Sequence, residues 1–254
     1  MLHKTYIYSI FLPRTELFFI EEWARHHFNL GIKKIYLYHN GFKPLDTSLI
    51  GNNHTIKKRE NEDYKWAKKP LDDYNLQLSD EEIDSTLQKI EDKFSGRLHI
   101  KYWHPNKAGP YPASQLLGYK ELRGNLQKIR KSSWHLHHPP VRWLIIDVDE
   151  FLMLHKSDNI QGLIERYRNY GSIHIKSKVF AARQNGKRVR SIYQWGYESK
   201  LCKTIVVNKG TPRIKAHLSR SRVVKNSIEI QRRDAEIFHY RGPPWSGNAI
   251  FREF

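Results

Sequence analysis

A short acidic motif follows a strongly apolar segment in the middle of the chain. Residues 141–146 are apolar except for Arg142, and Asp147, Asp149 and Glu150 come directly after them. Isolated buried carboxylates are costly, so grouped carboxylates are normally paired or bound to a cation. Alternate side chains of an extended segment share a face, so we expect Asp147 and Asp149 to point the same way. Two such carboxylates can bind Mg²⁺ or Mn²⁺ and leave coordination positions for water and substrate phosphates.

Three interpretations of this motif are open. In the first, it is a strand-end turn whose acids are solvated or paired with arginines. Phosphatases of the haloacid dehalogenase type carry Asp-x-Asp near the N-terminus and usually follow it with Thr, whereas Glu150 follows here and more than half of the chain precedes Asp147. Nucleotide-sugar glycosyltransferases of the GT-A type carry the motif mid-chain, after a nucleotide-binding βαβ half, and this arrangement fits the sequence better.

The charge of the chain is strongly positive and unevenly distributed. The 254 residues have a formal net charge of +18, and residues 155–254 hold 21 Lys and Arg against 7 Asp and Glu. A basic surface attracts the phosphates of nucleotides, nucleic acids or anionic membranes without choosing among them.

The cysteine content and the apolar runs narrow the class of protein. Cys202 is the single cysteine, which excludes an intramolecular disulfide and a cysteine-based zinc site. The apolar runs of the N-terminal segment are too short to cross a bilayer, and no small-residue cleavage site follows them. We therefore expect a cytoplasmic protein.

The periodicity predicts alternating strands and helices. Strands are expected at 4–12 and 32–40, with a helix between them that begins at an N-cap, Thr15, and stops at Gly31. This βαβ unit favours a parallel sheet, whose ligands bind at the carboxyl ends of the strands. Further helices are expected at 79–96, with Ser79 and Glu82 as a capping box, at 112–130 and near 159–170, and further strands at 98–104, 141–146, 172–180, 203–208, 213–217 and 236–241.

Five blocks of the sequence, in order, resemble glycosyltransferases of family 92 and the related family-2-like group. They read TELFFIEEWARHHFNLGIKKIYLYHNG, SQLLGYKELR, WLIIDVDEFLML, KLCKTIVV with RIKAHLS, and IFHYRG. The resemblance implies a GT-A fold: α/β, Rossmann-like, with a mixed, mostly parallel central sheet and helices on both faces. It implies a single domain over 1–254, with a nucleotide-binding half at 1–150 and a basic acceptor and metal half at 151–254.

The resemblance also implies roles for individual residues. Asp149 would bind the metal directly, and Asp147 would hold the ribose hydroxyls or the metal through water. His239 would be the third metal ligand, and Glu150 would support the metal site or face the acceptor. An inverting transfer needs a general base, for which Glu198 is favoured over Asp234 and Glu236. The residues expected around the nucleotide are Glu16, Asn40, Gln115, Asp147, Lys203 and Arg241. Of these, Lys203 and Arg241 would neutralise the diphosphate.

The leading prediction is a metal-dependent glycosyltransferase that uses Mn²⁺ or Mg²⁺. It would move a hexose, with inversion, from a nucleotide sugar such as a UDP-sugar to a glycan or lipid-linked acceptor. The basic half would suit peripheral contact with the inner membrane face. The alternative is a metal-dependent nucleic-acid-binding protein or nuclease, although no known nucleic-acid-binding motif is present and the basic residues are scattered.

Overall fold

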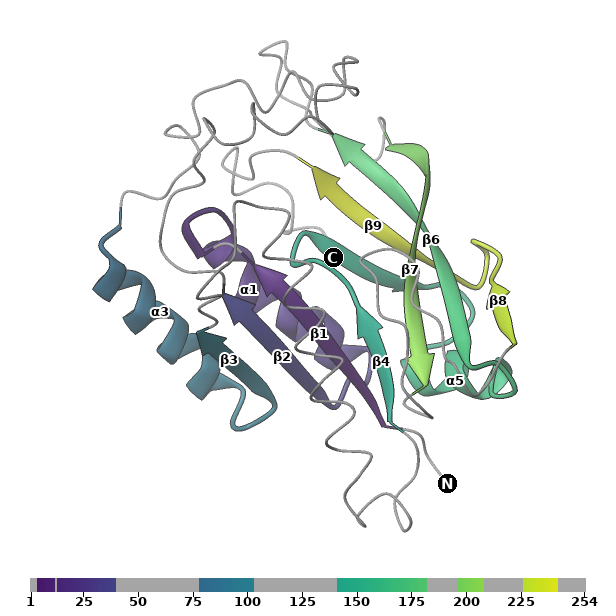
Figure 1. The fold of residues 1–254 in the computed structure, drawn as a ribbon, viewed down its shortest axis with the longest axis horizontal. Coiled ribbons are helices and arrows are strands. Elements are labelled where there is room, and N and C mark those ends of the chain that lie inside the picture. Colours follow the sequence, from purple (N-terminus) through teal and green to yellow (C-terminus); the bar gives the residue numbers. More distant parts are fainter. Residues whose placement is uncertain are drawn as a thin grey trace, which may run out of the picture.

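The strands of the described chain form one mixed sheet. The computed structural model describes residues 4–11, 13–39, 78–102, 141–181, 196–207 and 226–241. Within these residues the sheet has nine strands in the order β3-β2-β1-β4-β7-β6-β9-β5, and β8 pairs with β6 (Figure 1). The strands are β1 Thr5–Phe11, β2 Lys34–His39, β3 Leu98–Tyr102, β4 Arg142–Ile145, β5 Glu150–Leu154, β6 Ser172–Ala181, β7 Gly196–Val207, β8 Ser227–Glu229 and β9 Ala235–Arg241.

One half of the sheet is parallel, as the sequence predicts. β1 pairs in parallel with β2 on one side and with β4 on the other, and β2 pairs in parallel with β3. Helix α1, Pro13–Asn29, connects β1 to β2 and completes the predicted βαβ unit. The carboxyl ends of β1, β2 and β4 therefore face one edge of the sheet, where the acidic motif follows β4 (Figure 1).

The other half of the sheet mixes directions. β7 lies antiparallel between β4 and β6, and β5 pairs antiparallel with β9. β6 runs parallel to both β8 and β9. Parallel pairings outnumber antiparallel ones, so the prediction of a mixed, mostly parallel sheet in an α/β chain is confirmed, and the arrangement is consistent with a Rossmann-like nucleotide-binding fold. The sequence did not predict β5 or β8, and β7 begins earlier than expected.

Local signals set the ends of the helices, with one error in the prediction. The structure starts α1 at Pro13, which is favoured at a first helical position, so Thr15 lies inside the helix and is not its N-cap. Gly31 ends the helix as predicted: its φ is +91°, the Ile32 amide donates to the His27 carbonyl, and the Gly31 amide donates to the Phe28 carbonyl. This is the Schellman arrangement of a helix C-terminus.

Two further helices match their predicted positions. Helix α3 spans Asp80–Lys93 and has the expected capping box, in which the Ser79 side chain accepts from the Glu82 amide and the Glu82 carboxylate accepts from the Ser79 amide. Helix α5 spans Ile160–Arg166. The predicted helix at 112–130 and the predicted strand at 213–217 lie outside the described residues.

The sheet separates two apolar clusters. The larger one takes Ile7 and Leu144 from one face of the strands and joins them to buried residues of α1, α3 and α5. The smaller one contains Tyr8 and Trp143, which point to the opposite face because strand side chains alternate. Helices on this second face stay a prediction, because the helix expected at 112–130 is not described.

None of the helices that the structure describes combines the length and the apolar character needed to span a bilayer.

Candidate functional site

The acidic motif forms a tight turn between two strands. The Glu150 amide donates to the Asp147 carbonyl at 3.1 Å, so residues 147–150 form a turn and not the extended segment that the sequence suggested. The Glu150 carboxylate accepts from the Asp147 amide at 2.8 Å, so a side-chain hydrogen bond stabilises the turn together with the backbone one. Val148 and Glu150 are buried, whereas the side chains of Asp147 and Asp149 are 25 % and 29 % exposed. Both aspartate side chains thus reach the surface, but the extended geometry from which the sequence placed them on one side is absent.

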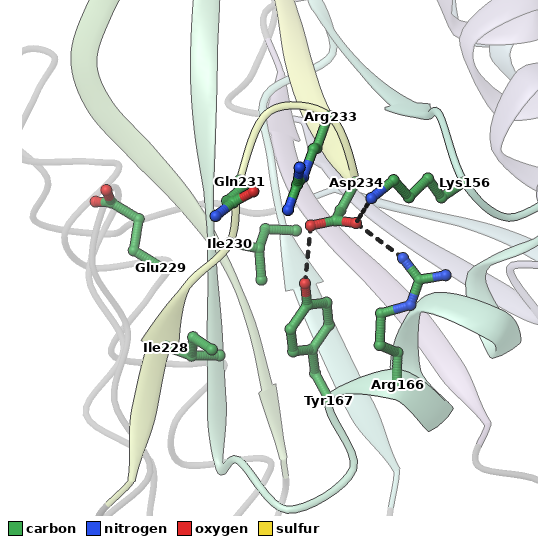
Figure 2. Close-up of a pocket in the computed structure, with 9 residues that line it drawn as sticks. All are labelled: Lys156, Arg166, Tyr167, Ile228, Glu229, Ile230, Gln231, Arg233 and Asp234. Carbon is green, nitrogen blue, oxygen red and sulfur yellow. Dashed lines mark hydrogen bonds and ion pairs between the residues drawn. The ribbon is translucent and has the colours of Figure 1, made fainter.

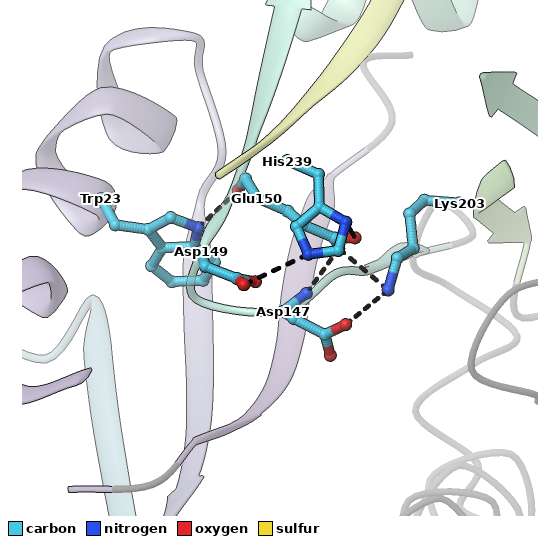
Figure 3. A network of polar contacts seen from close by, with 6 residues as sticks. All are labelled: Trp23, Asp147, Asp149, Glu150, Lys203 and His239. Atoms are coloured by element: carbon cyan, nitrogen blue, oxygen red, sulfur yellow. Dashed lines mark hydrogen bonds and ion pairs between the residues drawn. The ribbon is translucent and has the colours of Figure 1, made fainter. Parts of the chain in front are cut away.

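A buried lysine lies between two of the carboxylates. Lys203 Nζ is 2.7 Å from Asp147 Oδ2 and 2.9 Å from Glu150 Oε2, and its side chain is only 1 % exposed (Figure 3). Pairing of Thr204 with Ile145 brings β7 alongside the end of β4 and so places Lys203 beside the turn. The sequence suggested that Lys203 neutralises a diphosphate, but in this structure its ammonium group neutralises carboxylates of the protein.

His239 approaches the turn from β9. Its Nε2 is 3.2 Å from Asp149 Oδ2, and its Nδ1 is 3.5 Å from Glu150 Oε1. Glu150 and His239 are direct partners in the antiparallel ladder of β5 and β9, which explains why residues 89 positions apart meet. The His239 ring therefore lies between the two carboxylates, one buried and one accessible (Figure 3).

The buried carboxyl group of Glu150 has a perturbed acidity. Burial raises its pKa above the ordinary value, and the charges of Asp147 and Asp149 act in the same direction. Lys203 and His239 oppose this effect, because positive charge nearby favours the ionised carboxylate. Glu150 is thus held in place by a lysine, a histidine and a backbone amide, and has no exposed side for a substrate.

Helix α1 fixes the strand that follows the turn. Trp23 Nε1 donates to the Glu150 carbonyl at 2.7 Å, and the Leu152 amide donates to His27 Nε2 at 3.3 Å. His26 Nε2 donates to the Leu152 carbonyl at 2.8 Å, so three side chains satisfy the β5 backbone on the edge that no described strand pairs with.

These three residues were not predicted to act together. Trp23, His26 and His27 are spaced i, i+3 and i+4, which places them on one face of a helix. That spacing was the available signal, but the backbone they contact belongs to β5, a strand that the sequence did not predict.

Two further predicted residues are placed on the edges of the site. Glu16 lies in the first turn of α1, directly beyond the carboxyl end of β1, and is partly buried. Glu198 lies in β7 opposite Lys178, which is in turn opposite Phe238 of β9. Its backbone is thus two strands, or roughly 10 Å, from the β9 segment that carries His239. The side chain of Glu198 is not described.

Asp234 is not brought to the turn. It precedes β9, five residues before His239, which corresponds to roughly 16 Å along an extended strand. There it accepts from Arg166 at 2.8 Å and from Tyr167 at 3.0 Å (Figure 2). These contacts keep its carboxylate at the far end of β9, so the prediction that Asp234 serves the same reaction centre as Asp149 is not supported by its position.

The other predicted residues cannot be placed at side-chain level. Arg241 ends β9, two residues after His239, and only its backbone is described. Asn40 and Gln115 lie outside the described residues.

The three predicted metal ligands do not meet at one point in this structure. In the described part of the chain, no three His, Cys, Asp or Glu side chains are grouped so that they could hold a metal ion. Of the three predicted ligands, Asp149 and His239 contact one another, whereas Asp147 contacts Lys203. The donors of the first pair nevertheless suit a divalent cation, and a carboxylate behind the second nitrogen of a histidine is the usual companion of a metal-binding imidazole. Glu150 stands in that position.

Comparisons with known proteins do not assign this chain to a family. No protein-family model matches the chain, and no curated protein matches it. The resemblance to family 92 therefore stays a prediction.

Some solved structures show a weak likeness. A UDP-glucose pyrophosphorylase from Acinetobacter baumannii shares 12 % identity over 94 % of this chain and 86 % of its own, with a TM-score of 0.37. A UTP-bound UGPase from the same bacterium has a TM-score of 0.33 at 12 % identity over the same shares. An apo UDP-glucose pyrophosphorylase has a TM-score of 0.31 at 10 % identity over 94 % and 90 % of the two chains. Scores of this size say nothing about activity, so function has to be inferred from the chain's own residues.

Proposed function

We propose that this protein is a metal-dependent glycosyltransferase that moves a hexose from a nucleotide sugar, such as a UDP-sugar, to a glycan or lipid-linked acceptor with inversion. The observation that carries the proposal is the position of the 147–150 turn. It follows β4 at the edge where the parallel strands β1, β2 and β4 end, which is where α/β sheets bind their ligands. The sequence blocks that resemble family 92 supply the reaction class.

Asp149 and His239 are the residues that would hold Mn²⁺ or Mg²⁺. Their facing atoms are already 3.2 Å apart, and both side chains reach the surface, at 29 % and 12 % exposure. When bound, the cation would neutralise charge that develops on the leaving diphosphate. Glu150 would orient the His239 ring through Nδ1, and Lys203 would keep Glu150 and Asp147 in place.

The assignment of the general base follows from burial. Glu150 is 1 % exposed and bonded within the protein, so it is poorly placed to deprotonate an acceptor hydroxyl. Asp234 lies at the other end of β9, and Glu236, two residues on, pairs with His155 and Arg232. Glu198 is therefore the base that we propose, with Glu16 near the nucleotide.

Metal-dependent nucleotide binding tests the proposal. We expect UDP with Mn²⁺ to raise the melting temperature of the wild type by mass action, and neither UDP nor Mn²⁺ alone to do so to the same extent. Asp149→Asn and His239→Asn should abolish the Mn²⁺-dependent part of the shift. Asp84→Asn is the matched control, because Asp84 is an exposed aspartate of α3 and should leave the shift unchanged.

Two outcomes would overturn the proposal. One is a nucleotide-induced shift that persists in Asp149→Asn at the wild-type size. The other is the absence of any shift with UDP, GDP or CMP, together with stabilisation by DNA or RNA that declines with salt, which would favour the nucleic-acid-binding alternative. Release of UDP from a UDP-hexose would then test transfer. The anomeric configuration of the sugar in the product would test inversion.

A further inference from the structure

A cavity lies away from the acidic turn. It has a volume of about 480 Å³, which is within the range of small-molecule pockets. It is formed where the end of α5, the segment after β5 and the turn before β9 meet (Figure 2). Asp234 precedes β9, so the cavity lies at the opposite end of that strand from His239. Its lining residues are Lys156, Arg166, Tyr167, Ile228, Glu229, Ile230, Gln231, Arg233 and Asp234.

A buried carboxylate fixes two cations at the rim of this cavity. Asp234 is 8 % exposed; its Oδ1 is 2.8 Å from Arg166 Nη1 and 3.3 Å from Lys156 Nζ, and its Oδ2 accepts from Tyr167 at 3.0 Å. Burial alone would raise the pKa of Asp234, but hydrogen bonds from Tyr167 and Lys156 bring it below the ordinary value, so the carboxylate stays charged. Arg166 and Lys156 remain 41 % and 43 % exposed, so they keep donors for a ligand.

A third cation adds to these two. Arg233 makes no hydrogen bond or ion pair with the residues that the structure describes, and Figure 2 shows its guanidinium group between Gln231 and Asp234, pointing into the cavity. Glu229 does not cancel this charge, because it pairs with Lys176 at 3.0 Å. Three cations and two carboxylates therefore line this cavity, and Lys176 beside it offsets the charge of Glu229.

We propose that this cavity binds the phosphomonoester group of a small organic phosphate. The excess of cations over carboxylate matches a group that carries a charge of about −1.5 to −2 near neutral pH, and guanidinium groups bind phosphate oxygens in a two-pronged fashion. The Tyr167 ring, with Ile228 and Ile230, supplies an apolar wall for the organic part of the ligand. The site goes beyond the proposed glycosyl transfer and does not rest on it.

Calorimetric titration at constant ionic strength tests this site. The ligands are glucose 6-phosphate, inorganic phosphate and uncharged glucose. We expect saturable binding of glucose 6-phosphate, weaker binding of inorganic phosphate and none of glucose. Arg233→Ala should weaken glucose 6-phosphate binding at least about tenfold, the usual value of one charge-assisted contact. Because Arg233 is exposed and without a described partner, this variant should fold like the wild type.

Two control variants distinguish binding in this cavity from a general effect of positive charge and from binding at the acidic turn. Arg168→Ala removes an equal charge from an exposed arginine two residues beyond Arg166, paired with Glu165, and should not change binding. Asp149→Asn should not change it either, since the acidic turn is at the other end of β9. Equal losses in Arg233→Ala and Arg168→Ala would show a general charge effect and overturn the proposal, as would loss in Asp149→Asn or no saturable binding by the wild type.

Discussion

At the scale of single residues, Lys203 determines how the acidic turn is stabilised. Removing one partner of a buried ion pair leaves an uncompensated charge and costs about 3–5 kcal/mol, more than the pair itself contributes. Lys203 and Glu150 are each 1 % exposed, so bulk water cannot replace the ammonium group at the Glu150 carboxylate. We therefore predict that Lys203→Met, which keeps the length of the side chain, lowers the free energy of unfolding by about 3–5 kcal/mol in urea denaturation.

A second lysine of the chain offers a matched control for this variant. Lys176 pairs with Glu229 at 3.0 Å, but their side chains are 42 % and 51 % exposed. Exposed pairs contribute less than about 1 kcal/mol, so Lys176→Met should change stability little. Equal losses in the two variants would contradict the role given to burial at Lys203.

The residues of the turn were predictable from their types, but their contacts were not. Three carboxylates after an apolar strand indicated a polar site, and the resemblance to family 92 pointed to His239. Lys203 follows Asp147 by 56 positions, and only the pairing of β7 with β4 brings the two together. The sequence contains no local signal for that pairing, so it suggested a phosphate partner for Lys203 where the protein supplies carboxylates.

At the scale of elements, the contact of α1 with β5 links stability to pH. His27 accepts a hydrogen from the Leu152 amide at Nε2, and Nδ1 must then donate to the Trp23 carbonyl 2.8 Å away, so the ring is neutral. The pKa of His27 lies well below its ordinary value, mainly because the ring is buried and to a lesser extent because of the nearby charge of His26. Burial also lowers the pKa of His26.

We predict that the native state loses stability as the pH falls below about 6.5, the pKa of histidine in an unfolded chain. In that range the unfolded state binds a proton that native His27 does not, so the free energy of unfolding falls by up to about 1.4 kcal/mol per pH unit for each such histidine. In urea titrations between pH 7 and 5, His27→Gln should show a shallower decline than the wild type. Identical pH profiles would contradict the neutral, buried state of His27.

Elements whose signals are local were predicted well. The capping box at Ser79, the glycine at 31 and the alternation of β1 and β2 each act within a few residues, and each is present in the structure. Thr15 was misjudged because a proline two residues earlier can begin the helix. β5 was missed because its five residues directly follow a turn, and its partners, β9 and α1, are distant in sequence.

At the scale of the whole molecule, the sequence order of the strands does not give their order in the sheet. β7 is inserted between β4 and β6, and β9 separates β6 from β5. The pairings of β4 with β7, of β6 with β9 and of β5 with β9 each join segments separated by a long stretch of chain. Hydrophobic periodicity reports the burial of one segment at a time, so it cannot rank such pairings. The α/β class was predictable from the βαβ unit, while the strand order of the half with mixed directions, which carries Lys203 and His239, was not.

The distribution of charge over the chain supports a last prediction, peripheral contact with an anionic membrane surface. Residues 155–254 carry 21 Lys and Arg against 7 Asp and Glu, and each basic residue near an anionic leaflet contributes about 1 kcal/mol. In vesicle co-sedimentation we expect retention on phosphatidylserine-containing vesicles at about 0.05 M salt and release at about 0.5 M, because the Debye length falls below about 10 Å above 0.1 M. Neutral phosphatidylcholine vesicles are the control and should not retain the protein. Binding to both kinds of vesicle, or binding that persists at high salt, would mean that apolar insertion and not charge holds the protein to the bilayer.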